Sequence, residues 1–285
     1  RGFLCLKGES IELLSERYES ILFEHFGTKY SQAIKNREAR DGREHHVTVI
    51  HKSELALVPE VAVPDTIGIL GLGVVKEGDN IALFITLYIP ELQKTRLSLD
   101  LPKANFHVTI GFSNADIHSK PKDVASLSPI FVPLIPIEEA LDAIGLMMQT
   151  RDFELALEYS SLLVAHHPQG TRCKSHIIEC LHRLKRYSDC LDEISGSANL
   201  SKDQLLMKID CLLYLQEYSC ALAAIWHVAP SSTEGEQDRL IKALVRLQNK
   251  LPTGIRPDDL LLPDNTDPLS ITVKSIDQKQ MHEII

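Results

Sequence analysis

The chain has 285 residues, enough for two domains, and its 44% hydrophobic and 24% charged residues are ordinary for a globular protein. The net charge of −9 is uneven: residues 1–135 carry 15 basic and 17 acidic side chains, whereas residues 136–285 carry 15 and 22. The second half is therefore no general nucleic-acid surface. No apolar run is long enough to cross a membrane, so no membrane partner is expected.

The N-terminal residues and the cysteines suggest an intracellular protein. The first seven residues hold too short an apolar core for a secretory signal and no initiator Met, which favours a fragment of a larger protein. None of the six cysteines forms a C-x-x-C pair, and they fit reduced thiols in a cytoplasmic or nuclear protein. No cluster of His, Cys, Asp and Glu has metal-ligand spacing, so we expect no metal and no other cofactor.

The first predicted elements are a strand over residues 2–7 and a helix over 10–26, with Ser10 as its N-cap and Gly27 at its end. Residues 28–44 are predicted as a polar loop with a short helix. A basic stretch begins in this segment and continues to Lys52. One or two of its cations are candidates for binding a substrate phosphate. The basic residues are Lys29, Lys35, Arg37, Arg40, Arg43 and Lys52.

One short pattern occurs twice, 61 residues apart, as His46-Val47-Thr48-Val49 and His107-Val108-Thr109-Ile110. Each copy lies in a β-branched run that predicts a strand, at 46–50 and at 105–112. Because strand side chains alternate, each His shares a face with the Thr two residues later, and the valines face a core. His45 should face the side opposite His46, which favours packing over catalysis.

Three further elements are predicted between the two copies. Residues 66–75 and 81–89 read as strands joined by a turn at 77–80, and residues 91–98 as a short helix. The stretch 68–73 is glycine-rich, but it does not lead into a helix. It therefore indicates a bent strand and not a nucleotide-binding loop.

Four prolines between 121 and 136 mark a boundary, after which a helical pattern begins at Ile137. An aromatic followed by a small residue and Leu recurs at spacings of 34 and 31 residues, starting at Phe153, Tyr187 and Tyr218. This pattern resembles the tetratricopeptide repeat and predicts about three helical hairpins, with 234–249 as a capping helix. The second copy departs from the family pattern, with Ser195-Gly196 in place of a terminal proline.

The paired His-x-Thr motifs resemble those of the 2H phosphoesterase family over residues 2–120. The resemblance implies an α+β fold: a two-lobed phosphoesterase domain with antiparallel sheets, followed by an all-α TPR-like domain. The expected boundaries are 1–128 for the phosphoesterase domain, 129–136 for a Pro-rich linker and 137–250 for the repeats. No structure is predicted for the tail at 251–285.

Two imidazoles and two hydroxyls suit cleavage of a phosphodiester without a metal. One imidazole takes a proton from the attacking oxygen and the other gives one to the leaving oxygen, while the hydroxyls donate to the phosphate. The catalytic candidates are therefore His46, Thr48, His107 and Thr109. The residues leave the two histidine roles open; the resemblance implies His107 as base and His46 as acid. Weaker candidates for substrate binding are Arg43, Tyr88 and His118.

The resemblance implies hydrolysis of 2′,3′-cyclic phosphate ends of RNA, to a 2′-phosphate, in RNA or tRNA repair or processing. The alternatives are a small substrate such as ADP-ribose cyclic phosphate, or a module that binds nucleotides or RNA ends without cleaving them. Both motifs keep His and Thr, which favours the enzyme. The repeats are expected to dock a protein or a neighbouring domain.

Overall fold

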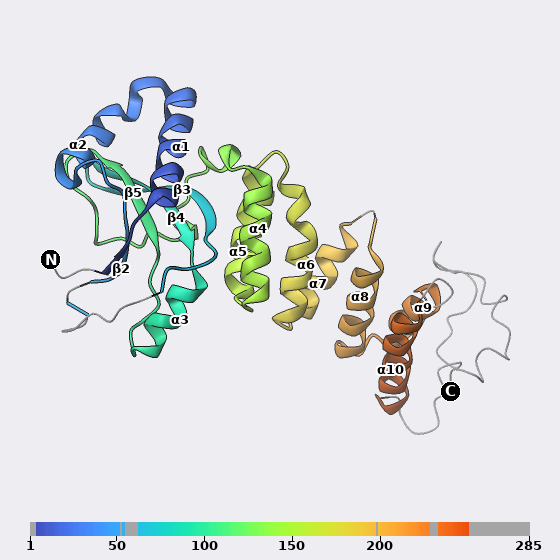
Figure 1. The fold of residues 1–285 in the computed structure, drawn as a ribbon. Helices are drawn as coiled ribbons and strands as arrows, with labels where there is room; N and C mark the ends of the chain where they lie inside the picture. Colours follow the sequence, from blue (N-terminus) through green and yellow to red (C-terminus); the bar gives the residue numbers. More distant parts are fainter. Residues whose placement is uncertain (1–3, 52, 55–61, 198, 229–232, 251–285) are drawn as a thin grey trace. The chain divides into compact units, whose positions relative to one another are not determined.

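The computed structural model describes residues 4–51, 53–54, 62–197, 199–228 and 233–250. The predicted tail at 251–285 lies outside these residues. The chain divides after Lys174 into two compact units. The first contains a five-stranded antiparallel sheet with helices, and the second is helical throughout its described part (Figure 1). The predicted α+β class, followed by an all-helical region, is confirmed.

The sheet of the first unit has the strand order β1-β2-β5-β4-β3, with every pair antiparallel. The strands are β1 (Leu4–Leu6), β2 (Val47–Ile50), β3 (Gly68–Glu77), β4 (Asn80–Tyr88) and β5 (His107–Phe112). The two motif strands, β2 and β5, are therefore neighbours in one sheet.

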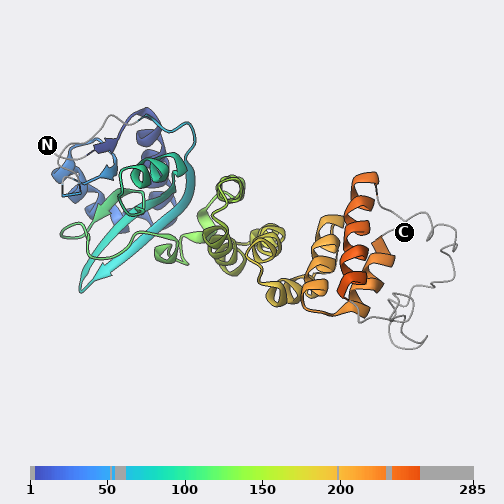
Figure 2. The same cartoon turned by 90° about the horizontal axis from the view of Figure 1, so that it is seen from below.

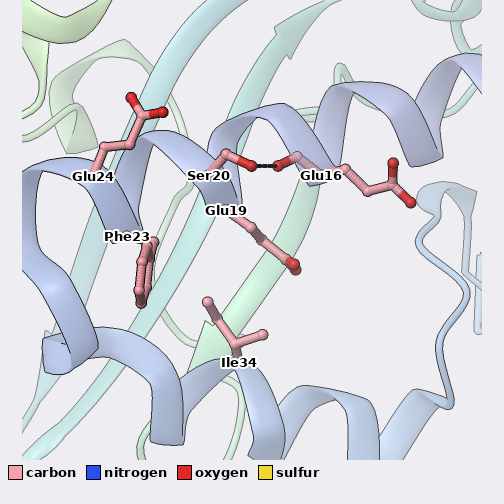
Figure 3. Close-up of a pocket in the computed structure, with 6 residues that line it drawn as sticks. All are labelled: Glu16, Glu19, Ser20, Phe23, Glu24 and Ile34. Carbon is pink, nitrogen blue, oxygen red and sulfur yellow. Dashed lines mark hydrogen bonds between the residues drawn. The ribbon is translucent and has the colours of Figure 1, made fainter.

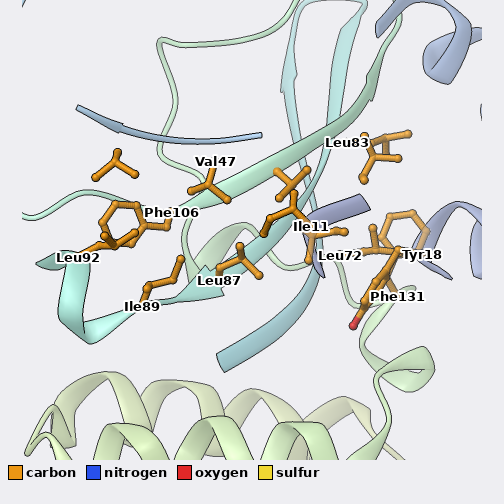
Figure 4. Packing of buried hydrophobic residues seen from close by; sticks show 14 of the residues in the cluster. Ile11, Tyr18, Val47, Leu72, Leu83, Leu87, Ile89, Leu92, Phe106 and Phe131 are labelled. Carbon is orange, nitrogen blue, oxygen red and sulfur yellow. The ribbon is translucent and has the colours of Figure 1, made fainter. Parts of the chain in front are cut away.

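Helices α1 (Glu9–Phe26) and α2 (Ser31–Asp41) lie in sequence between β1 and β2, with a 3₁₀ turn, η1 (Gly27–Tyr30), between them. The apolar face of α1 buries Ile11, Tyr18 and Leu22 in one cluster with Val47 and Val108 of the motif strands. Figure 4 shows side chains from α1 and the strands in this cluster. The buried valines fix which face of the sheet points to the core.

Helix α1 begins earlier than the sequence indicated. Its N-cap is Gly8, without a side-chain hydrogen bond, so the assignment of Ser10 as the cap was wrong. Its predicted end at Gly27 is confirmed, since this residue has φ 57° and its amide bonds the Phe23 carbonyl. The segment at 28–44 is more helical than predicted, because α2 occupies eleven residues of it.

Helix α1 is joined to the first motif by a buried imidazole. Nδ1 of His45 lies 2.7 Å from Oε2 of Glu12, and Nε2 lies 3.2 Å from Oε1 of Glu19. Burial alone would lower the pKa of His45, but the hydrogen bonds to Glu19 and Glu12 raise it above its usual value. As expected from strand alternation, this residue packs and His46 faces the other way.

The glycine-rich strand β3 is bent, as predicted. The pairing with β4 shifts register between Ile69 and Gly71, and Gly71 has φ 119°. A Cβ at Gly71 would meet the side chain of Ile135, and one at Gly73 would meet the ring of Phe84. The glycines therefore make room for side chains that cover the sheet.

Helix α3 (Pro90–Ser98) connects β4 to the strand of the second motif, and its Arg96 is buried. The guanidinium donates to the Val49 carbonyl at 2.6 Å and to the Pro102 carbonyl at 2.9 Å, and it pairs with Glu54 at 2.5 Å. Arg96 thus ties the end of the first motif strand to the segment that leads into the second.

A helical hairpin completes the first unit. After the 3₁₀ turns η2 (Val124–Ser126) and η3 (Val132–Leu134) come α4 (Ile137–Gln149) and α5 (Phe153–His166). Helix α4 packs against β3, and the buried Tyr159 hydroxyl donates to the Leu70 carbonyl at 3.0 Å. The hairpin predicted to open the repeats therefore also covers part of the sheet.

The second unit consists of α6 (Lys174–Arg183), α7 (Tyr187–Ser195), α8 (Lys202–Tyr214), α9 (Tyr218–Val228) and α10 (Glu234–Lys250), with η4 (Gly170–Cys173) just before it. Helix α8 packs against α7 and α9. Helix α10 contacts both α8 and α9 (Figure 2), at the place predicted for a capping helix.

The three helical hairpins share one turn. The residue two before each predicted aromatic has a positive φ: Arg151 at 62°, Lys185 at 60° and Gln216 at 66°. The next residue is Asp152, Arg186 or Glu217, and its amide donates to the carbonyl five residues before it, at 2.9 Å in each case. This is the Schellman type of helix end, used three times. The same helix end therefore precedes each of the three aromatic residues that the sequence pattern marked.

We expect Gly111→Ala to destabilise the protein. A Cβ at this position in β5 would lie 2.7 Å from the Ala33 carbonyl carbon and 2.8 Å from the Ile34 nitrogen in α2, and backbone atoms cannot turn aside. Overpacking of this kind costs about 1–3 kcal/mol. Gly145→Ala in α4 is the matched control, since its Cβ would meet nothing within 4 Å and should stabilise by about 0.5–1 kcal/mol. Urea unfolding of both variants measures the difference, and equal effects would contradict the close approach of α2.

The His45 contacts predict a pH-dependent stability. A pKa raised in the folded state stabilises the protein fully below the unfolded value of about 6.5, and this stabilisation is lost as pH rises through the folded pKa. We expect His45→Gln to cost on the order of 1 kcal/mol more at pH 5.5 than at pH 8.5. Urea unfolding of wild type and variant at both pH values measures this, and a cost independent of pH would show that the imidazole is not charged.

Candidate functional site

One strand pair brings the four motif residues together. Val47 of β2 is the antiparallel partner of Val108 of β5. This register places His46 opposite Thr109 and Thr48 opposite His107. All four side chains lie on the face of the strand pair opposite to the buried valines. Directly opposite residues have Cβ atoms about 5 Å apart, and diagonal ones about 7 Å. The two imidazoles therefore occupy one diagonal of a four-residue square and the two hydroxyls the other.

The two faces of this strand pair differ in access to solvent. Val47 and Val108 are fully buried, whereas His46, Thr48, His107 and Thr109 are only partly buried. A phosphate group can therefore reach the square from solvent while the valines hold the strands in the core. The predicted catalytic residues are brought together as one cluster.

The second motif histidine has a defined tautomer. Nδ1 of His107 lies 2.8 Å from the Asn105 carbonyl oxygen, which can only accept. Nδ1 therefore carries the proton, and Nε2 keeps a lone pair. The ring packs edge-on against Phe84, with centroids 5.9 Å apart. Burial, followed by the positive charge of Lys122, lowers the pKa of His107 to about 4, so the ring is neutral at pH 7.

The first motif histidine is perturbed in the same direction. Burial lowers the pKa of His46, and the Asp41 carboxylate opposes this without cancelling it. The positive charges of Lys7 and Arg40 add to the lowering. An anionic phosphate beside His46 would favour its protonated form, because an opposite charge stabilises an imidazolium.

The two motif threonines have different neighbours. Thr48 is the strand partner of Cys5 in β1, and it lowers the pKa of the Cys5 thiol, which burial raises more strongly. The Thr109 hydroxyl donates to Oδ2 of Asp116 at 3.1 Å. This bond differs from the expected role of Thr109 as a donor to phosphate, because its proton is directed at a carboxylate.

Several residues around the square were not recognised from the sequence. Asp116 and Lys122, in the loop after β5, form an ion pair at 2.8 Å, and their side chains are only 4% and 3% exposed. On β4, Phe84 pairs with Thr109 and Thr86 pairs with His107. The Thr86 hydroxyl is buried without a hydrogen-bond partner. No local motif marks these residues, because only the strand pairing and the loop path bring them to the site.

The basic stretch contributes one residue to this cluster. Arg40 lies at the end of α2, 3.4 Å from Oδ2 of Asp116, and its guanidinium stacks on Phe112 at 4.6 Å from the ring centroid. The register shift between Leu83 and Phe84 corresponds to one extra residue in β5, which turns Phe112 toward this side. Arg37, by contrast, is buried against Glu19 and the Gly42 carbonyl.

The three weaker candidates lie in different surroundings. Arg43 and His118 are exposed, in the segments before β2 and after β5. Tyr88 is buried in β4, and its hydroxyl lies 2.7 Å from Oγ1 of Thr150 in the turn between α4 and α5. The tyrosine hydroxyl is thus held by the hairpin.

A separate hollow lies between α1 and α2 (Figure 3). It is lined by Glu16, Glu19, Ser20, Phe23, Glu24 and Ile34. Three carboxylates would repel a phosphate, so this hollow does not fit the chemistry of the motifs.

Within the described part of the chain, no group of three or more His, Cys, Asp and Glu side chains is arranged to hold a metal ion. No helix among the described residues has the length and apolar character needed to cross a membrane. None of the six cysteines, all of which lie in the described part of the chain, is in a disulfide.

Comparison with known proteins agrees with the geometry. No curated protein and no solved structure gave a significant match to the chain. Residues 2–118 match the family model described as the Swiss Army Knife 2H phosphoesterase domain, a region that contains both motifs. This match supports the 2H phosphoesterase family for the N-terminal region, and with it a phosphodiesterase-type activity in general.

Proposed function

We propose that the protein is a metal-independent phosphodiesterase that opens 2′,3′-cyclic phosphate ends of RNA, in RNA or tRNA repair or processing. The observation that carries this proposal is the square of two imidazoles and two hydroxyls on one accessible face. The Cβ atoms of diagonal residues are about 7 Å apart, so a phosphate group can approach between the two histidine side chains. An attacking and a leaving oxygen can then each meet one imidazole.

The proposed reaction follows from the state of each imidazole. Nε2 of His107 takes a proton from water, whose oxygen attacks phosphorus, and the bond from phosphorus to the ribose 3′ oxygen breaks. His46 donates its Nε2 proton to that leaving oxygen, which gives a 2′-phosphate and a free 3′-hydroxyl. His107 suits the base because its Nε2 lone pair is free and its ring is neutral.

The choice of substrate rests on size and charge. The first 135 residues carry a net charge of only −2, and the cations beside the square are few. A long duplex would need many phosphate contacts, whereas a terminal cyclic phosphate needs a site for one group. The strained ring also makes opening easier than cleavage of an ordinary linkage.

We also propose that the helical hairpins are tetratricopeptide-like and dock a protein or a neighbouring domain, in a cytoplasmic or nuclear setting. The threefold recurrence of the same helix end supports the repeat assignment. The six free thiols are compatible with a reducing compartment.

Incubation of the protein with a short RNA ending in a 2′,3′-cyclic phosphate, in metal-free buffer, tests the activity. We expect a mass gain of one water and a 2′-phosphate that phosphatase removes. His46→Ala and His107→Ala should each reduce the rate by at least about 10²-fold, because each removes one proton transfer. His25→Ala is the matched control, since this exposed imidazole on α1 lies outside the site.

Two outcomes would count against the proposal. Wild-type turnover in either motif variant would rule out the two-histidine mechanism. No opening of the RNA end, together with opening of ADP-ribose cyclic phosphate or another small cyclic nucleotide, would reassign the substrate. Binding of the RNA end without any turnover would favour the non-catalytic module.

The two histidines also predict an acidic pH optimum. For kcat/KM, His107 must be unprotonated, which holds above about pH 4. His46 must be protonated, which holds below its pKa, and burial places that pKa under 6.5. The value of kcat/KM should therefore rise through about pH 4 and fall before pH 7. A pH–rate profile measures this, and an optimum above pH 7 would contradict the assignment of acid and base.

A further inference from the structure

Lys122 and Asp116 form a buried ion pair beside the second motif. The Lys122 ammonium lies 2.8 Å from Oδ1 of Asp116, and both side chains are almost fully buried. Taking two charges out of water is costly, and a pair of this kind is poor evidence for stability alone. Lys122 also lies beyond the region that matches the phosphoesterase family. Its place in the structure therefore calls for a reason other than packing.

The two members of the pair reach the second motif by different routes. Oδ2 of Asp116 accepts the Thr109 hydroxyl proton at 3.1 Å. The Lys122 ammonium lies 5.4 Å from the centroid of the Phe84 ring, which packs edge-on against the His107 imidazole. A fixed positive charge and the imidazole thus share the same aromatic ring.

We propose that the Lys122–Asp116 pair is the positioning element of the second motif: Asp116 fixes the Thr109 hydroxyl, and Lys122 holds a positive charge that disfavours a second one on His107. The inference rests on the proposed function, in which His107 is the base. Neither residue touches the substrate; both act through motif side chains.

The charged groups around His107 set the sign of the effect. Lys122 and His118 disfavour the protonated ring, whereas Asp116 favours it, and Lys122 is the strongest of the three. Arg40 reaches His107 only through its contact with Asp116 at 3.4 Å. Removal of Lys122 therefore leaves burial and an acidic neighbour, and the ring should become more basic.

The fixed hydroxyl has a second effect. Because Asp116 accepts the Thr109 proton, the hydroxyl oxygen keeps its lone pairs for another donor. In the β2–β5 register, Thr109 lies opposite His46. The oxygen is then placed to accept from the His46 ring or from a protonated phosphate, and Asp116 controls its direction.

Titration of the histidine rings by two-dimensional NMR tests the electrostatic part, with His107→Gln to assign the signal. In Lys122→Met the pKa of His107 should rise from about 4 by roughly one unit or more. Lys122→Arg should restore the wild-type value. Lys120→Met is the matched control, because this exposed lysine two residues away carries the same charge and should have no effect.

A double variant separates electrostatics from damage to the fold. Lys122→Met leaves Asp116 with Arg40 as its charged neighbour and can unfold the loop, whereas Lys122→Met with Asp116→Asn removes both charges. If the role of Lys122 is Coulombic, the pKa of His107 should be highest in Lys122→Met, lower in the double variant, lower again in the wild type and lowest in Asp116→Asn. An unchanged pKa in both Lys122→Met and the double variant would overturn the proposal.

The activity readout is independent of the titration. If the RNA end is a substrate, the acid limb of kcat/KM in Lys122→Met should move up with the pKa of His107, while Lys120→Met keeps the wild-type profile. If no substrate is turned over, the NMR titration still decides whether Lys122 controls His107. Failure of the proposed function and failure of this inference are thus distinguishable.

Discussion

The antiparallel pairing of Val47 with Val108 is the contact on which the site depends. The valines are fully buried, and their burial fixes the face of each strand that remains for His and Thr. If β2 shifted by one residue in this pairing, His46 would turn toward the core and Val47 toward solvent, while the side chains of β5 would keep their faces. The hydrophobic core therefore holds the arrangement of the four motif residues as well as the fold, and no side-chain contact between the two histidines is needed to bring them together.

Electrostatics adds what the strand register cannot supply. The two rings stand in related positions, yet only His107 has its Nδ1 proton committed to a backbone carbonyl. The residue before His46 is His45, whose ring contacts the carboxylates of Glu12 and Glu19 on α1. In this segment, the pKa values of two adjacent imidazoles are thus shifted in opposite directions, upward for His45 and downward for His46, because alternate side chains enter different surroundings.

Much of this arrangement could be predicted from the sequence, since it depends on local patterns. The β-branched runs around both motifs, the turn at 77–80 and the aromatic spacing of the hairpins all report on nearby residues. The neighbouring position of β2 and β5 could not be predicted, because 61 residues and two other strands lie between the motifs. Asp116, Lys122 and Phe84 were missed for the same reason: each reaches the square through tertiary structure. The Ser10 cap failed because the loop ends at Gly8, where a backbone with φ 138° needs glycine.

The attachment of the α4–α5 hairpin to the sheet bears on where this module can be cut. The Tyr159 hydroxyl of the hairpin donates a hydrogen bond to the Leu70 carbonyl of β3, and the Tyr88 hydroxyl of β4 is hydrogen-bonded to Thr150 in the hairpin turn. A fragment that stopped at residue 118, where the family resemblance ends, would lose both contacts and would leave Asp116 without its lysine. The compact unit that contains the sheet runs to Lys174. The region that matches the family model and the compact folded unit thus have different boundaries, and an exchange of domains between proteins would have to respect the longer one.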